Sequence, residues 1–89
     1  MNEITMLEML KVDLGISTTA YDTRLLQYLT SAQDYIEREG ITLNGEKVSD
    51  MNLVVMYAAW LWRKRDTAEA MPRMLRWNLN NRLFYEKAD

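Results

Sequence analysis

Cysteine and histidine are both missing from this chain of 89 residues. Without cysteine, the chain can form neither a disulfide framework nor a thiol-based site. Without histidine, it lacks the commonest general base and the commonest metal ligand. Neighbouring acidic residues such as Asp34 and Glu37 are carboxylate pairs of the kind that bind hard cations, but no further polar motif accompanies them. We therefore expect no enzyme activity, no cofactor and no metal site.

Turn-forming residues and long apolar runs are also scarce. One proline and three glycines indicate a helical protein with few turns. The longest apolar run, residues 53–62, has ten residues, whereas a helix needs roughly 20 to span a bilayer. Glu3 and Glu8 interrupt the N-terminal segment, which is untypical of a signal peptide. We expect no membrane association and a protein that is made and kept in the cytoplasm.

Apolar residues make up 48% of the chain, which predicts one folded domain over residues 1–89. We expect this domain to pack around the apolar run 53–62. On a helix, Leu53 and Trp62 fall on opposite sides, so the rest of the chain, or another subunit, must cover this segment all round. Short apolar runs can also be buried strands. The alanines within the run and the basic residues 63–65 after it favour a helix.

Two further helices are predicted before this central run. Thr5 as N-cap, with Glu8 three residues later, indicates the start of the first helix, and Gly15 indicates its end. Gly40 ends the second helix, whose apolar residues recur at helical spacing: Leu25, Leu29, Ala32 and Ile36. With a fourth helix near the C-terminus, the predicted fold is all-α, a small bundle of four helices.

The segment between the second and third helices, residues 41–48, has a different character. Its Asn44-Gly45 pair is the strongest short-range signal for a β-hairpin. The segment is short, so a projecting loop is an equally open alternative. In both cases we expect its tip to contact a partner through Thr42, Asn44, Gly45 and Glu46.

The last predicted helix runs from Pro72, which suits a first helical turn, to about Phe84. One face is an apolar stripe of Leu75, Leu79 and Leu83. The opposite face is aromatic and basic, and consists of Arg73, Trp77, Asn80 and Phe84. One monomer is not expected to bury both faces, and exposed aromatic and arginine residues are typical of protein interfaces. We therefore predict a subunit interface on the second face.

The net charge of −2 is unevenly spread along the chain. Residues 1–50 hold nine acidic and four basic residues, whereas residues 51–89 hold seven basic and four acidic ones. Such asymmetry suggests a partner, and it would also let copies of this chain meet head to tail. Arg63 and Arg65, directly after the central run, are assigned to the same predicted subunit interface.

The last helix also suggests an alternative function. Arginine and asparagine are residue types that contact phosphates and base edges. The helix carries Arg73, Arg76, Asn78, Asn80, Asn81 and Arg82. The alternative is therefore a small DNA-binding regulator. The acidic total charge and the lack of a short glycine-containing turn between two helices favour a protein–protein surface instead.

Several motifs occur in the order and spacing of one known family. They are Leu7-x-x-x-Lys11-x-x-Leu14, Asp22-x-x-Leu25, Ala32-x-x-x-Ile36-x-x-x-Gly40, residues 53–65 and Met71-Pro72-Arg73-Met74-Leu75-Arg76. Together they cover nearly the whole chain, and residues 53–65 are the closest part. The chain resembles the head–tail connector (adaptor) family of tailed phages, whose members are also described as possible DNA-packaging proteins.

The resemblance implies a structural virion protein of a phage or prophage, without catalytic residues. Copies of the protein would form a homo-oligomeric ring beneath the portal protein. The ring would extend the channel through which DNA passes without sequence-specific binding. It would also offer a platform to a stopper or tail-completion protein. Such a protein is found in the host cytoplasm during assembly and at the head–tail junction of the virion.

Overall fold

The computed structural model describes residues 2–88 and leaves Met1 and Asp89 undescribed. It contains α1 (Glu3–Leu14), α2 (Asp22–Arg38), α3 (Val48–Lys64) and α4 (Arg73–Ala88). Residues 2–88 form no strand, so the predicted all-α fold with four helices is confirmed. In this part of the chain, no helix is both long enough and apolar enough to cross a membrane.

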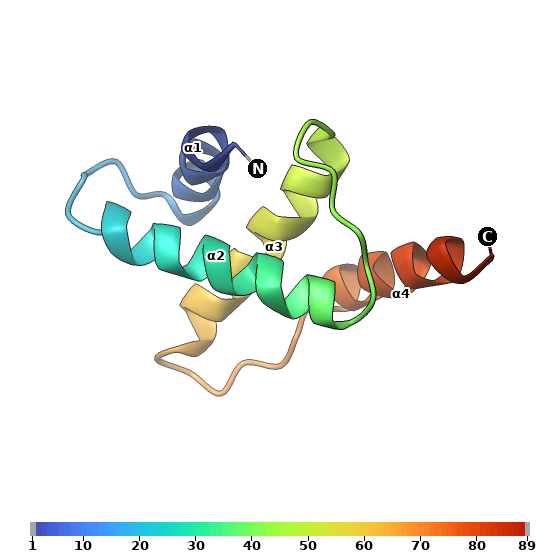
Figure 1. The fold of residues 1–89 in the computed structure, drawn as a ribbon. Coiled ribbons are helices and arrows are strands. Elements are labelled where there is room, and N and C mark those ends of the chain that lie inside the picture. The colour runs from blue at the N-terminus through green and yellow to red at the C-terminus, as the bar shows by residue number, and fades with distance from the viewer. Residues whose placement is uncertain (1, 89) are drawn as a thin grey trace.

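Helix α3 is the element around which the other helices pack, as its apolar run predicts. Both α1 and α2 lie against it (Figure 1). Val54, Val55 and Ala58 are almost completely buried, because different helices cover different sides of α3. Trp60 and Trp62, near the C-terminal end of α3, are only partly buried. The middle of α3 is therefore covered on most sides, and its C-terminal end is more open.

One hydrophobic core joins all four helices. Its largest fully buried apolar side chains are Met6, Leu10, Leu25, Leu29, Ile36, Val54, Val55, Leu75 and Leu79. Burying a side chain of this size stabilises the folded state by about 1.5–3 kcal/mol relative to leaving it in water. The helical spacing of these residues therefore explains both the helices and the faces by which they pack.

Helix α1 begins earlier in the chain than the sequence predicts. Its N-cap is Asn2, not Thr5, and the Asn2 side-chain oxygen accepts a hydrogen bond from the backbone N–H of Thr5 at 3.1 Å. Asparagine is among the best N-cap residues because its side chain satisfies an otherwise unpaired N–H group. At the other end, Gly15 has a φ of 70° and ends the helix as predicted.

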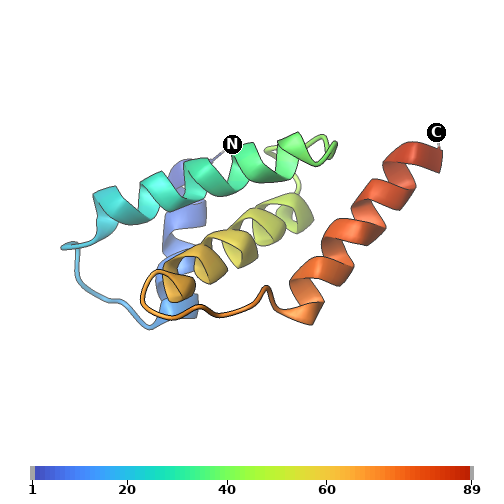
Figure 2. The same cartoon turned by 90° about the horizontal axis from the view of Figure 1, so that it is seen from below.

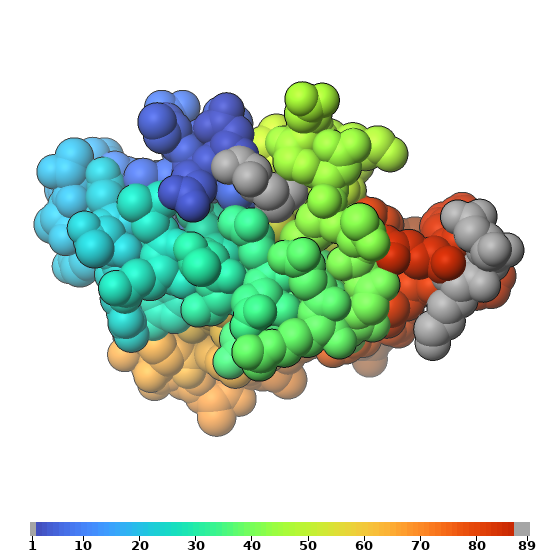
Figure 3. All heavy atoms as spheres, viewed as in Figure 1, coloured from blue at the N-terminus to red at the C-terminus, as the bar shows by residue number. Residues whose placement is uncertain are grey.

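The α2–α3 connection is a loop, so the hairpin alternative is wrong. The Asn44 side chain accepts a hydrogen bond from the N–H of Glu46 at 2.9 Å. This bond holds a turn at Gly45. Residues 41–47 form no strand, and α3 begins at Val48, the residue that a hairpin would pair with Ile41. The yellow-green atoms of the loop tip and of the first turn of α3 stand out at the edge of the domain in Figure 3.

Two residues of the predicted projecting loop are bound to the rest of the domain. The backbone N–H of Thr42 donates a hydrogen bond to Glu86 of α4 at 2.6 Å. The backbone N–H of Asn44 donates to Asp50 of α3, also at 2.6 Å. The backbone of Thr42 and Asn44 is thus bound to the helices, although both residues and Glu46 at the tip are exposed. Contact of this loop with a partner stays a prediction.

Helix α4 lies at one side of the domain and extends away from the other three helices (Figure 2). It packs on α3 through its leucine face. Leu75 and Leu79 are buried in the core, and Leu83 is partly buried against it. Only one face of α4 is therefore covered within this chain.

Candidate interaction surface

The α4 face opposite the buried leucines is exposed to solvent. Trp77 is 60% exposed and Phe84 is 71% exposed. Arg73 and Asn80, which share this face by helical spacing, are exposed as well. We call these four residues the outer face of α4. The predicted division of α4 into a buried leucine face and an exposed aromatic and basic face is confirmed, and its role as a subunit interface stays a prediction.

Two more large apolar side chains extend the outer face of α4 along its edge. Met74 is 63% exposed, and Tyr85 is 69% exposed. The rings of Phe84 and Tyr85 pack edge to face, with centroids 6.2 Å apart. Soluble monomers rarely leave large contiguous apolar patches in water, and such patches mark interaction sites. The outer face of α4 is accordingly the candidate interaction surface of this protein.

Arg63 and Arg65 lie elsewhere, at the C-terminal end of α3. The Arg65 guanidinium stacks on the Trp62 ring at 3.6 Å from its centroid, and it also pairs with Asp66 at 3.4 Å. Arg63 is exposed and forms no ion pair within residues 2–88. The structure therefore divides the predicted interface between two elements, and Arg63 is the more available of the two arginines.

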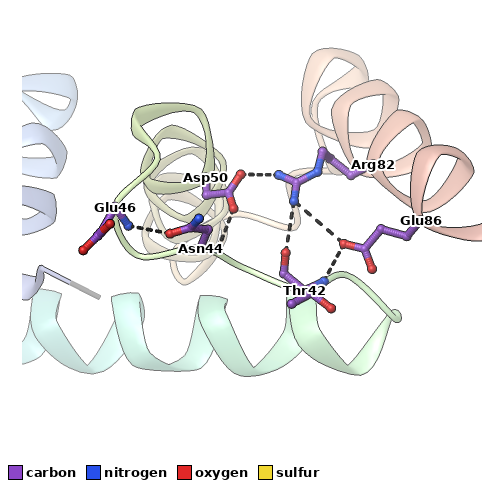
Figure 4. Close-up of polar contacts among 6 residues, drawn as sticks. All are labelled: Thr42, Asn44, Glu46, Asp50, Arg82 and Glu86. Carbon is purple, nitrogen blue, oxygen red and sulfur yellow. Dashed lines mark hydrogen bonds and ion pairs between the residues drawn. The ribbon is translucent and has the colours of Figure 1, made fainter. Parts of the chain in front are cut away.

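A buried ion pair holds α4 against the start of α3 (Figure 4). Asp50 is 1% exposed, and its carboxylate accepts hydrogen bonds from Arg82 of α4 and from the backbone of Asn44. The same guanidinium donates to the carbonyl oxygen of Thr42 at 3.1 Å and lies 3.8 Å from Glu86. This cluster fixes which face of α4 points inward, and consequently where the outer face points.

The sequence does not indicate this cluster. For Arg82 the sequence suggests only contact with DNA, and for Glu86 it suggests no role. The ion pair joins residues 32 positions apart, so no local pattern indicates it. The one available signal was an acidic residue in the first turn of a helix that is otherwise strongly apolar.

An aromatic cluster covers another part of α3. Tyr57 stacks on Tyr35 with centroids 5.9 Å apart and meets the edge of Trp60 at 5.5 Å. The Trp60 ring nitrogen donates to the carbonyl oxygen of Glu69 at 3.1 Å. Burial raises the pKa of the Tyr57 phenol, and the nearby negative charge of Glu39 raises it further. These contacts bind the 65–72 connector to the core and give this cluster a structural role.

A groove of ≈ 430 Å³ runs between α1, α3 and α4. Its lining mixes polar and apolar side chains: Asp13, Ser49, Asn52, Leu53, Met56, Asn78, Asn81, Arg82 and Tyr85. Within residues 2–88, no group of three or more acidic residues is placed to hold a metal ion. In this groove Arg82 is already bound to Asp50, and the other lining side chains form a mixed polar and apolar contact surface.

Comparison with known proteins gives no match: no family model, no curated protein and no solved structure is similar to this chain.

Proposed function

We propose that this protein is a structural component of a virion: a ring-forming head–tail connector, or adaptor, between the portal and the tail of a tailed phage or prophage. The observation that carries the proposal is the outer face of α4. Trp77 and Phe84 are exposed there, while Leu75 and Leu79 on the opposite face are buried. The order of the family motifs along the chain suggests the family, and this face supplies a surface for self-association.

In the proposed mechanism, copies assemble around an axis through complementary surfaces. DNA passes through the central channel without sequence-specific contacts. The portal protein meets one side of the ring, and a stopper or tail-completion protein meets the other. The acidic first half and basic second half of the chain would favour one register of neighbouring copies. Because exposed ion pairs are weak, this effect falls mainly on specificity and association rate.

The alternative, a DNA-binding regulator, has less support from the arrangement of the α4 arginines. Arg76 pairs with Glu39 at 3.0 Å, and Arg82 is bound to the buried Asp50. Both guanidinium groups are thus neutralised by carboxylates of the same chain. A phosphate-binding helix needs cations that are free to replace counterions, and of the three arginines Arg73 alone has no ion pair within residues 2–88.

Two measurements on the purified protein test the proposal together. Sedimentation at rising protein concentration should show a closed oligomer of defined mass. Titration of a DNA duplex at several salt concentrations should show no shift. A dimer that binds DNA with a steep loss of affinity at higher salt would favour the regulator instead. A chain that remains monomeric at every concentration would contradict self-assembly of the isolated protein.

A further inference from the structure

Helix α1 carries a second exposed apolar surface. Ile4 is 73% exposed and Val12 is 80% exposed. Beside Val12 lies a shallow hollow of ≈ 340 Å³. Its lining consists of Thr5, Glu8, Met9, Val12, Asp13 and Asn52. We call Ile4 and this lining the α1 surface. It offers apolar contact area with acidic groups at its edge.

The charges on the α1 surface are opposite to those on the outer face of α4. Glu8 and Asp13 form no ion pair with residues 2–86, whose side chains the structure describes, and the same holds for Arg73 on α4. All three side chains are exposed. The outer face of α4 thus carries an unpaired cation beside exposed aromatic side chains. The α1 surface carries unpaired carboxylates beside exposed aliphatic side chains.

We propose that the outer face of α4 of one copy docks on the α1 surface of the next copy, with Trp77 and Phe84 against Val12 and Arg73 toward Glu8 and Asp13. This inference rests on the self-association in the proposed function and identifies its two surfaces. The apolar contact supplies the affinity, and the charged residues at the edge set the register.

The dimensions and positions of the two surfaces suit this contact. At 1.5 Å per residue, Ile4 to Val12 spans about 12 Å and Arg73 to Phe84 about 16 Å, so two helices can pack side by side along these lengths. In Figures 1 and 2, α1 and α4 lie toward opposite sides of the domain. The contact is heterologous, because it joins two different surfaces. Heterologous contacts form a ring when the rotation between copies closes.

Cysteine cross-linking tests the proposed contact. Because the chain contains no cysteine, native thiols cannot form disulfides that compete with the engineered ones. Val12→Cys and Asn80→Cys place one thiol on each surface and leave Trp77 and Phe84 in place. Oxidation of the two variants mixed in equal amounts should yield a disulfide-linked dimer that contains one copy of each. Either variant alone should yield little dimer. Ser31→Cys on the exposed side of α2 measures the level of random collision.

The outcomes separate this inference from the proposed function. If the unmodified chain assembles but the mixture gives no more dimer than the Ser31→Cys control, the surfaces are wrong while self-assembly stands. Efficient linking of Asn80→Cys to itself would show an isologous α4–α4 contact and would also overturn the inference. A chain that is monomeric at every concentration contradicts both proposals.

Charge exchange provides a second, independent test. Glu8→Lys and Arg73→Glu should each weaken association about two- to fivefold, as expected for an exposed ion pair. The variant that carries both changes should recover most of the loss, because the opposite charges meet again. Glu37→Lys, on the exposed side of α2, is the matched control for a change in net charge. If the combined variant is weaker than either single variant, these residues do not face each other.

Discussion

The carboxylate of Asp50, in the first turn of α3, is bound by the guanidinium of Arg82 in the middle of α4. The Asp50 side chain is 2% exposed, so it depends on this partner and on the N–H of Asn44 for its hydrogen bonds. Negative charge in the first turn of a helix also interacts favourably with the helix dipole. This pair therefore joins α3, the α2–α3 loop and α4 in one arrangement.

Replacement of Arg82 by leucine should be strongly destabilising. The change leaves the Asp50 carboxylate buried without its charged partner, which typically costs about 3–5 kcal/mol. The exposed pair of Arg76 with Glu39 provides the control, since Arg76→Leu should cost at most about 1 kcal/mol. Urea denaturation of the three proteins measures the difference. If Arg82→Leu and Arg76→Leu lower the free energy of unfolding equally, the buried pair contributes no more to stability than the exposed pair.

Truncation of the outer face of α4 should affect assembly and not folding. Trp77→Ala together with Phe84→Ala removes side chains that are mostly in solvent. We expect unchanged helicity, a folding free energy within about 1 kcal/mol of the original, and association weakened by about 2 kcal/mol or more. Circular dichroism checks helicity and folding stability, and sedimentation checks association.

The core variant Leu79→Ala should behave in the opposite way. Leu79 is fully buried, so its truncation leaves a cavity and should cost about 2–5 kcal/mol of folding stability. If the Trp77/Phe84 variant unfolds as readily as the Leu79 variant, both aromatics contribute to the fold, and their assignment to an interface is wrong.

Charge reversal should have different effects at Arg63 and at Arg65, the two arginines at the C-terminal end of α3. Arg63→Glu changes an exposed charge that makes no ion pair within the described part of the chain, so it should slow assembly in low salt and leave stability intact. Arg65→Glu also removes the stacking on Trp62, which is worth about 0.5–1 kcal/mol at an exposed site. Sedimentation at two salt concentrations and thermal melts distinguish the effects. Assembly of Arg63→Glu at the original rate in low salt would remove Arg63 from the interface.

Tyr57 should make stability depend on pH in the alkaline range. Burial and Glu39 raise the pKa of its phenol, so the folded state holds this proton more tightly than the unfolded state. The resulting stability is fully present below the ordinary tyrosine pKa of about 10 and is lost as the pH rises through the folded pKa. The stability advantage of the original protein over Tyr57→Phe should therefore be constant below the ordinary tyrosine pKa of about 10 and shrink as the pH rises above it.

The exposed Tyr85 supplies the control for this pH experiment, as Tyr85→Phe changes a ring that is 69% in solvent. The Tyr85→Phe series therefore records what removal of an exposed phenol does to stability over the same pH range. A Tyr57→Phe difference that stays constant over this range would contradict a raised pKa in the folded state.

The sequence by itself determined the helices and their inward faces. Leucines such as Leu25 and Leu75 recur at helical spacing, and Gly15 permits the positive φ that ends α1. These signals are local, because backbone conformation and amphipathic periodicity depend on neighbours within a few turns. The same periodicity predicted correctly that Trp77 would face away from the leucines of α4.

Only the tertiary structure decided how α4 and the α2–α3 loop are fixed. Asp50 and Arg82 meet across 32 positions, and Thr42 meets Glu86 across 44. Such pairs depend on where whole helices pack, and a charged residue in the sequence is equally compatible with solvent, DNA or a buried partner. Helical spacing alone puts Arg73 and Arg82 on opposite sides of α4. The packing then gave Arg82 its buried partner Asp50, which the sequence of α4 does not reveal.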